Sequence, residues 1–402
     1  MFRCGLVWIP KMSSNNRKRW IAPWKDSATK PAMYHCVSRV VDRRFVLEDD
    51  EREQFRKLMR MCERFSGCRV LSYCIMSNHF HLLLEVPPMP AEGIPDAELF
   101  ERLGAFYSEA HLAEIAREMA DVVVVRPRGE SEMPRVDVAG LPVSTEQEAE
   151  LARLDAGRRL DEIRSRFTRR MHNLSEFMKS LLERFTKWFN SKHKRSGHLW
   201  EDRFKSVIVE DGVAARTMAA YIDLNPVRAA MVADPAEYRW SSYGEAIGGG
   251  AKGIGKKSRE GLVRACLAHE GAGFEAERWK DASRIYRRLM GMALGKNKGR
   301  AAGTAAVEGR GVVTRNTTEM LQSEDNETVL PDLGMAVMLL CRIRCFTDGA
   351  VIGSRAFVNE AFEGARERFG RNRKDGARPM RGSGSAAKGV LWSLRDLRTG
   401  VA

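Results

Sequence analysis

The sequence predicts an α+β protein built on an antiparallel sheet, and three observations carry that prediction. Apolar and polar residues alternate in AMYHCVSRV (32–40), as in a half-buried strand. An amphipathic helix follows in LEDDEREQFRKLMRMCERF (47–65), with acidic residues in its first turn and Gly67 just beyond its end. Two further strands, 68–76 and 79–86, are joined by a tight Ser77–Asn78 connection. A strand, a helix and a strand hairpin begin an α+β domain with an antiparallel sheet.

A charged and locally irregular segment interrupts this pattern after the hairpin. Pro87, Pro88 and Pro90 break the strand, and we interpret 88–165 as an insertion with helices near 96–120 and 145–168. Regular periodicity then returns. The elements expected there are a helix over 174–193, a strand over 204–210, and a helix from about 212 that Pro226 ends.

Three regions are therefore expected: a basic arm (1–31), a catalytic domain (32–246) and a basic, mainly helical C-terminal extension (247–402). The extension begins in the glycine-rich run IGGGAKGIGKK and shows helical patterns near 259–268, 275–295, 332–345 and 354–369. Its segment 341–370 places a turn at Asp348–Gly353 between two helical patterns. A helical hairpin is the favoured interpretation, and a helix-turn-helix that docks on duplex DNA is the alternative.

Composition narrows the class of partner. The 402 residues carry a formal net charge of +14 and a pI of about 9.6, which suits a polyanion but is also met in merely basic proteins. The eight cysteines form no C-x-x-C pair, so a zinc site is not expected. We expect these cysteines to be reduced thiols, as in a cytoplasmic protein. No apolar stretch is long enough to cross a membrane, and the apolar part of the N-terminus is too short for a signal peptide.

The first chemical motif is His79-Phe80-His81. Side chains at positions i and i+2 of a strand point to the same face, so the two imidazoles project together while Phe80 turns into the core. Such a pair is a partial coordination sphere for a divalent cation. Two surface histidines are the alternative, but the strongly apolar continuation LLLEV indicates a rigid, buried strand behind them.

The second motif is AAYIDLNPVRAAMV (219–232). Tyr221 and Asn225 are four positions apart and so share one face of the expected helix. Tyr221 would present its phenol where Asn225 presents an amide oxygen to a metal. Taken alone, a core tyrosine and an ordinary Asn-Pro helix stop explain the segment better.

The third motif is KHKRSGHLWEDRFKS (192–206), in which basic and aromatic residues are interleaved. In single-stranded nucleic-acid sites, charges follow the backbone and rings stack on bases, whereas a solvated basic loop with a Trp anchor is the alternative. The residues expected to contact DNA are Lys192, Lys194, Arg195, His198, Trp200, Arg203 and Lys205.

Together these motifs resemble the REP-associated tyrosine transposases, relatives of the bacterial single-tyrosine insertion-sequence transposases of the HUH class. The matching segments are MYHCVSRV, SNHFHLLLEV, SGHLWEDRFKS, YIDLNPVRAAMV and YRWSSY, in the family's order. They cover roughly 32–88 and 170–245, and leave out the insertion and the segment beyond 247.

The resemblance implies a ferredoxin-like sheet with helices, a homodimer, and cleavage of single-stranded or hairpin DNA. It implies that His79 and His81 bind Mg²⁺ or Mn²⁺, that Tyr221 is the nucleophile, and that Asn225 is the third ligand, a position held by Gln in some relatives. In that chemistry the ion polarises the scissile phosphate, and the tyrosine forms a covalent phosphotyrosine that a released 3′-hydroxyl later attacks.

Three other functions remain open from the sequence. A non-catalytic protein that binds hairpin DNA would keep the fold without cleavage. A metal-dependent nuclease would use water and leave Tyr221 as a packing residue. An RNA-binding protein would show the same basic and aromatic pattern, because that pattern does not separate RNA from DNA.

Overall fold

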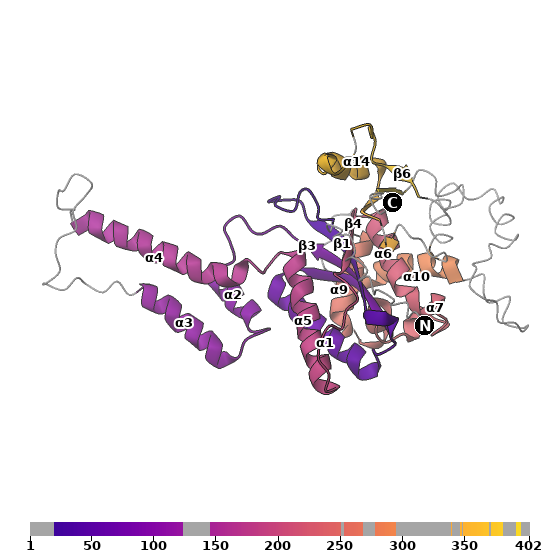
Figure 1. Cartoon of the computed structure of the whole chain (residues 1–402), viewed down its shortest axis with the longest axis horizontal. Coiled ribbons are helices and arrows are strands. Elements are labelled where there is room, and N and C mark those ends of the chain that lie inside the picture. Colours follow the sequence, from indigo (N-terminus) through magenta and orange to yellow (C-terminus); the bar gives the residue numbers. More distant parts are fainter. Residues whose placement is uncertain are drawn as a thin grey trace, which may run out of the picture.

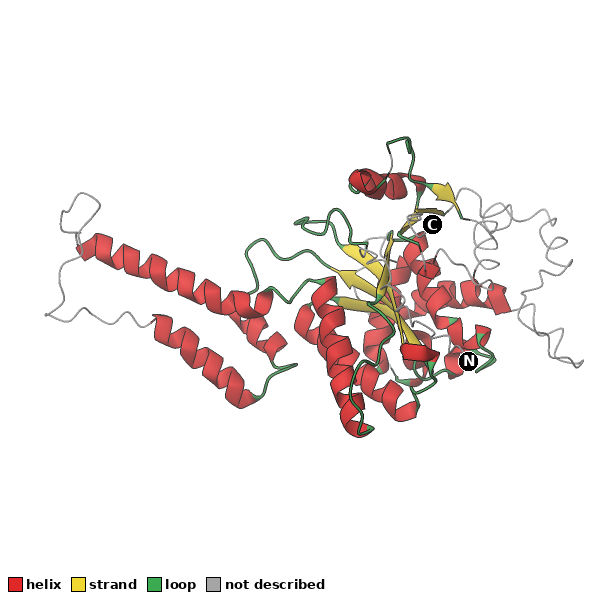
Figure 2. Cartoon of the chain, in the orientation of Figure 1, coloured by secondary structure: helices red, strands yellow, loops and turns green. Residues whose placement is uncertain are grey.

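The protein is described here from a computed structural model, which defines residues 20–123, 145–250, 253–267, 278–294, 339, 346–347, 349–369, 371–380 and 391–394. A sheet lies at the centre of the molecule, with helices on both of its faces (Figures 1 and 2). None of the helices in these ranges is both long and apolar enough to cross a membrane.

The sheet runs in the order β2-β3-β1-β4-β5-β7-β6. Its strands are β1 (Ala32–Arg39), β2 (Arg69–Ile75), β3 (His79–Val86), β4 (Lys205–Val209), β5 (Val351–Gly353), β6 (Arg378–Pro379) and β7 (Trp392–Leu394). The first four strands pair antiparallel, and with helices α1 and α5 they follow the β-α-β-β-α-β connectivity of a ferredoxin-like fold. The predicted α+β class with an antiparallel core sheet is therefore confirmed.

Helices α1 (Asp49–Ser66) and α5 (Leu174–Lys192) cover one face of the sheet. A capping box between Glu48 and Glu51 starts α1, and Gly67 ends it with the left-handed φ of 70° that glycine adopts without steric cost. Asn173 caps α5 by accepting from the backbone N–H groups of Ser175 and Glu176. These ends agree with the sequence predictions to within two residues.

The opposite face is covered by helices from residues 213–248 and from the segment that follows them. They are α6 (Val213–Asp223), the single turn α7 (Asn225–Arg228), α8 (Ser242–Gly248), α9 (Gly255–Leu267) and α10 (Trp279–Leu294). Pro226 lies in the first turn of α7, so the chain changes direction after Asp223 as the Asn-Pro pair predicted.

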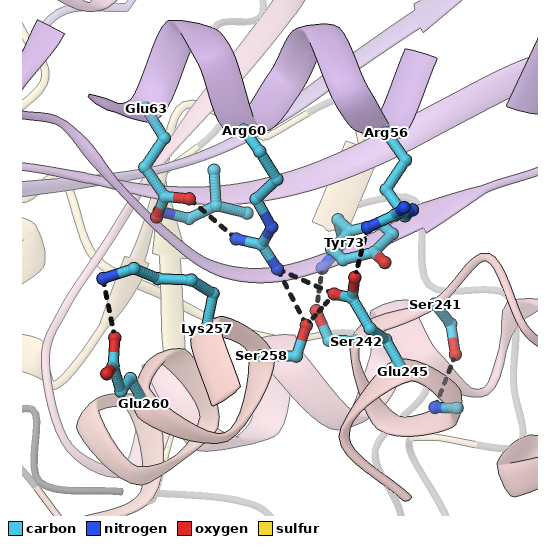
Figure 3. A network of polar contacts seen from close by, with 12 residues as sticks. Arg56, Arg60, Glu63, Tyr73, Ser241, Ser242, Glu245, Lys257, Ser258 and Glu260 are labelled. Atoms are coloured by element: carbon cyan, nitrogen blue, oxygen red, sulfur yellow. Dashed lines mark hydrogen bonds and ion pairs between the residues drawn. The ribbon is translucent and has the colours of Figure 1, made fainter. Parts of the chain in front are cut away.

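An ion-pair network joins the two helical layers around the β2 edge (Figure 3). Glu245 of α8 accepts from Arg56 and Arg60 of α1 at 2.8 and 2.9 Å, and its side chain is 1% exposed. Ser258 of α9 also bonds to Glu245, and it accepts from Arg60 at 2.8 Å. The Ser242 hydroxyl receives the backbone N–H of Tyr73, which ties α8 to β2. One buried carboxylate thus connects three helices.

The extension contributes strands as well as helices, and here one expectation was wrong. The Asp348–Gly353 segment was predicted to be a turn, but Val351–Gly353 forms β5, which pairs parallel with β4. α14 (Arg355–Glu363) follows it, and β6 and β7 complete the sheet edge. A strand of three residues has no measurable periodicity, and its partner lies far away in sequence, so no local pattern reveals it.

The insertion forms three helices, α2 (Asp96–Leu103), α3 (Glu109–Val123) and α4 (Thr145–Thr168). The single helix expected near 96–120 is split at Gly104–Ser108. α3 and α4 project from the body as an antiparallel pair (Figure 1). They share a small apolar cluster with α2 and α1, which includes Phe65, Leu99 and Phe167.

The end of the N-terminal arm lies against the core. Trp20 and Ala22 are buried, and the Tyr34 hydroxyl accepts the backbone N–H of Ala22 at 3.1 Å. The Trp20 ring contacts that of Phe369 in the extension, with centroids 5.7 Å apart. Residues 20–31 therefore contact both the first strand and the C-terminal segment, although they form only turns and bends.

Candidate active site

The two histidines of β3 lie on the face of the sheet that α6 covers. Phe80 points to the opposite face, where it is fully buried against Phe55 with ring centroids 4.6 Å apart. The ring centroids of His79 and His81 are 5.1 Å apart. The alternation predicted for His79-Phe80-His81 is therefore confirmed.

Tyr221 lies on α6, where its ring contacts His81 and a further histidine, His35. Its ring centroid is 6.2 Å from that of His81 and 6.3 Å from that of His35 on β1, both in edge-to-face geometry. The side chain is buried, with 3% of its surface exposed. Folding therefore brings the tyrosine and the paired histidines, which are far apart in sequence, into one cluster.

His35 links His81 to the C-terminal extension. Its Nε2 lies 3.0 Å from Nδ1 of His81, and its Nδ1 lies 2.6 Å from the carbonyl oxygen of Phe346. A carbonyl oxygen can only accept, so Nδ1 of a neutral His35 carries the proton and its Nε2 accepts. His81 must then donate from Nδ1, which leaves the lone pair on its Nε2. The carbonyl of Phe346 thus sets the tautomer of His81 through His35.

Both of these histidines are held neutral by their surroundings. Burial lowers the pKa of His35 from 6.5 to about 4, against the opposing effect of the Phe346 carbonyl. Burial also lowers the pKa of His81 well below 6.5, and the neighbouring His79, His35 and Arg228 add to the shift. A neutral imidazole is the form that binds a metal ion, so His81 is in the ligating form near neutral pH.

Asn225 and Arg228 close the other side of the cluster. The Asn225 amide nitrogen donates to the carbonyl oxygens of Tyr221 and Ile222, at 3.2 and 3.0 Å. Its amide oxygen accepts from Arg228 at 2.9 Å. The Arg228 guanidinium also lies 4.1 Å from the centre of the Tyr221 ring and donates to the Tyr221 carbonyl at 2.8 Å. A fixed cation therefore stands beside the phenol.

Two residues of the extension complete the enclosure. The Phe346 ring packs edge-to-face on Tyr221, with centroids 4.6 Å apart, and is 1% exposed. The carbonyl oxygen of Leu339 accepts from Arg228 at 2.9 Å. The C-terminal extension thus contacts Tyr221, Arg228 and His35 through these two residues.

The donors present fit a divalent cation only in part. His79 and His81 supply two nitrogen ligands on a rigid strand, and the Nδ1 of His79 is oriented by the Asn78 side-chain oxygen at 2.6 Å. In the part of the chain that the structure describes, no three His, Cys, Asp or Glu side chains form a metal-binding group. The Asn225 oxygen accepts from Arg228, which occupies one of its two lone pairs.

The residues predicted to contact DNA do not form one uniform surface. Lys192 is paired with Asp50 and Glu51 of α1 at 3.1 and 2.7 Å. The Trp200 ring packs on Phe80 and Phe185, and its Nε1 donates to Thr186 at 3.1 Å. Lys194, His198, Arg203 and Lys205 are exposed, and Arg195 is half-buried. Trp200 therefore anchors the segment, and the exposed residues around it carry its positive charge.

Three residues of the cluster were not singled out from the sequence: His35, Arg228 and Phe346. His35 stands in MYHCVSRV on the same face of β1 as Val37, which pairs with His81. A buried histidine inside a strand was the available signal. Arg228 follows the Asn-Pro pair on α7. No local signal points to Phe346, because its role depends on the path of the extension.

Comparison with known proteins supports the resemblance seen in the motifs. The family model for IS200-like transposases matches residues 28–91, which contain β1, α1, β2 and β3. A solved structure of a REP-associated tyrosine transposase bound to a REP hairpin is 12% identical, with a TM-score of 0.32. That match covers 60% of this chain and 90% of the other. No curated protein matches the sequence significantly.

The matched segment contains both His79 and His81, together with His35, while Tyr221 and Asn225 lie beyond it. The resemblance to the transposases predicted from the motifs is confirmed for residues 28–91, which match the family model for IS200-like transposases.

Proposed function

We propose that this protein is a single-tyrosine DNA transposase that cleaves and rejoins single-stranded or hairpin DNA through a covalent phosphotyrosine on Tyr221. The observation that carries the proposal is the position of the Tyr221 ring, 6.2 Å from the ring of His81 and on the same face of the sheet as both histidines. A phenol and two imidazoles on rigid elements are the groups that such a reaction requires.

Tyr221 is the proposed nucleophile. Its phenolic oxygen attacks the phosphorus of a phosphodiester and loses its proton, while the bond to the 3′ oxygen breaks and a 3′-hydroxyl leaves. The energy of the broken bond is retained in the phosphotyrosine, so the 3′-hydroxyl of a strand can reverse the step and rejoin DNA. Tyr221 lies beside the histidines of its own chain, so this reaction needs no residue of a second copy.

Arg228 is proposed to stabilise charge during the attack. Its guanidinium lies 4.1 Å from the centre of the Tyr221 ring. A fixed cation at that place favours the negative charge that develops on the phenolic oxygen and on the phosphate, and it needs no rearrangement to do so.

His79 and His81 are proposed to hold Mg²⁺ or Mn²⁺, which when bound would polarise the scissile phosphate. The relay from Phe346 through His35 keeps His81 in the tautomer with its lone pair on Nε2. Asn225 is proposed as the third ligand through the second lone pair of its amide oxygen, because the first accepts from Arg228. A homodimer and a cytoplasmic location are further proposals that rest on the resemblance alone.

The alternative is a protein that binds hairpin DNA without cleaving it. The burial of Tyr221, with 3% of its surface exposed, favours this alternative, because a scissile phosphate must reach the phenol before attack. Cleavage therefore requires that Phe346 move away from the tyrosine, whereas simple binding does not.

A denaturing-gel adduct assay separates the two functions. Full-length protein is incubated with Mg²⁺ or Mn²⁺ and end-labelled single-stranded hairpin DNA from the sequence flanking its own gene. Wild type is expected to give a labelled protein band, and Tyr221→Phe none, because phenylalanine keeps the ring contacts with Phe346 and Arg228 but has no nucleophile. His79→Ala is expected to lower the adduct yield by at least about 100-fold.

The outcomes are distinct. Cleavage without an adduct that survives Tyr221→Phe would assign the reaction to water and sink the tyrosine mechanism. Tight hairpin binding with no cleavage, tested against a random hairpin pool to exclude a wrong substrate, would establish the non-catalytic alternative. Competition with the matched RNA hairpin tests the choice of DNA.

A further inference from the structure

The loop after β1 and the turn after α5 enclose a pocket of about 500 Å³ that the proposed chemistry does not use. The first loop lines it with Arg44, Phe45 and Val46, and the second with His193 and Arg195. The two segments are joined by backbone bonds, from Val41 N–H to the Leu199 carbonyl and from Glu201 N–H to the Arg39 carbonyl, at 2.9 and 2.8 Å.

Phe45 stands at this pocket with its ring in solvent. It is 78% exposed and is the one aromatic residue among the large exposed hydrophobic side chains of the described ranges. An exposed phenylalanine leaves apolar surface in water, which costs free energy unless a partner covers it. A flat aromatic ring beside a pocket is the platform on which nucleobases stack.

The charges around the pocket favour an anionic partner. Arg44 on the first loop is exposed. On the second loop, the Arg195 guanidinium is held 5.6 Å from the Phe189 ring and donates to the His198 carbonyl at 3.0 Å. Glu48 is the one carboxylate in the pocket lining, and its side chain accepts from the backbone N–H of Glu51 at the start of α1. Glu51 itself accepts from Lys192 and from His193. The two arginines of the lining, Arg44 and Arg195, leave the pocket with a net positive charge.

The pocket is also coupled to the strand that carries the metal-binding histidines. The Asn78 amide donates to the Arg43 carbonyl at 2.9 Å, and its own carbonyl accepts from Val40 at 2.9 Å. Leu47 N–H donates to the Ser77 carbonyl at 2.9 Å. Three hydrogen bonds therefore tie the Phe45 loop to the turn immediately before His79.

We propose that this pocket binds one unpaired nucleotide of the DNA substrate, with its base stacked on Phe45 and its phosphate between Arg44 and Arg195. This inference rests on the proposed function for the choice of DNA. It assigns the stacking role to Phe45, because the Trp200 ring, the aromatic expected from the sequence, is packed between Phe80 and Phe185.

The test is an equilibrium binding measurement on full-length protein carrying Tyr221→Phe, so that no cleavage disturbs it. The probe is a fluorescent oligothymidylate of about 20 nucleotides. Phe45→Leu, which keeps the apolar volume but removes the ring, is expected to weaken binding by about 5- to 150-fold, the range seen when a stacking ring is lost. Phe45→Tyr is expected to bind within about twofold of the parent, because its ring still stacks.

Two controls separate stacking from charge. An abasic oligomer of equal length and charge offers no base, so Phe45→Leu is expected to leave its binding unchanged. Arg44→Gln is expected to reduce the slope of log K against log salt by about 0.7, the value for one phosphate contact on a single strand, whereas Phe45→Leu leaves the slope unchanged. Leu154→Ala, an exposed apolar truncation on α4, is the matched control and is expected to have no effect.

The proposal is overturned if Phe45→Leu binds oligothymidylate as the parent does, if the same loss appears with the abasic oligomer, or if the parent does not bind. Tighter binding of the matched oligouridylate would assign the pocket to RNA and overturn it as well. The adduct assay on wild type tests the proposed function separately. If wild type forms an adduct but Phe45→Leu does not weaken oligothymidylate binding, only the nucleotide subsite is refuted. If Phe45→Leu weakens binding but wild type forms no adduct, only the transposase function is refuted.

Discussion

The two faces of the sheet are built from the same strands but differ in chemistry. The face under α1 and α5 is filled by aromatic and aliphatic side chains, among them Phe55, Phe80 and Phe185. The face under α6 buries polar and titratable groups between its apolar residues, including His35, His81 and Asp223. Because side chains alternate along each strand, every residue of β1 and β3 contributes to one face or the other.

The difference shows how the molecule separates stability from reactivity. Burying an imidazole or a carboxylate costs free energy. Asp223 is an example, because burial raises the pKa of its carboxyl from 3.8 to about 7. The apolar face stabilises the sheet and offsets that cost. The polar face can then hold groups in unusual protonation states beside Tyr221.

Phe185→Ala should be the most damaging change to stability. The ring is fully buried on the apolar face, and it contacts Phe55 and Trp200 with centroids 5.2 and 5.8 Å apart. Its removal leaves a cavity and should lower the free energy of unfolding by about 4 kcal/mol, measured by urea denaturation. The adduct yield per folded molecule should stay near wild type. A loss of adduct chemistry in the folded fraction would contradict the division between the faces.

Glu245→Gln tests the network that connects the faces around β2. The change leaves Arg56 and Arg60 without their shared carboxylate, and it should cost about 3 kcal/mol. Leu154→Ala on the exposed surface of α4 is the control and should change stability by less than about 0.5 kcal/mol.

The same carboxylate predicts a pH dependence. Burial opposes ionisation of Glu245, but Arg60, Ser258 and Arg56 outweigh it and lower the pKa below 4.5. The folded protein therefore releases this proton more readily than the unfolded chain. The stability it contributes is present above pH 4.5 and is lost as the pH falls through the folded pKa. Urea titrations across that range should show a smaller decline in Glu245→Gln than in wild type; equal slopes would argue against the network.

His35→Ala should have the smallest effect, and it should act on chemistry more than on stability. Without His35, Nδ1 of His81 loses its partner and the tautomer is no longer set. The adduct rate at saturating Mn²⁺ should fall by about 10- to 100-fold, as for other residues that orient a metal ligand. His172→Ala is the matched control, because His172 also bonds a backbone carbonyl, that of Pro87, but lies at the insertion. Equal rates in the two variants would show that the relay has no role.

Local sequence was sufficient for much of the core. The ranges of β1, β2, β3, β4, α1 and α5 follow from period-two and period-3.6 patterns and a glycine stop, all of which act within a few residues. Strand geometry predicted that His79 and His81 share one face of their strand. The resemblance predicted that Tyr221 belongs to the same site. The split of the insertion at Gly104–Ser108 was missed, because one glycine is tolerated inside a helical pattern.

What the sequence determined by itself was the class of fold, the sharing of one strand face by His79 and His81, and, through the resemblance, the candidate nucleophile Tyr221. Tertiary structure alone decided which groups surround them. The short strands β5, β6 and β7 exist only because β4 offers them an edge. The bond from Phe346 through His35 to His81 joins segments that no local pattern relates, and packing moved Trp200 inward while leaving Phe45 in solvent. Periodicity reports which side of an element is buried, whereas contacts between distant segments depend on how the whole chain closes around them.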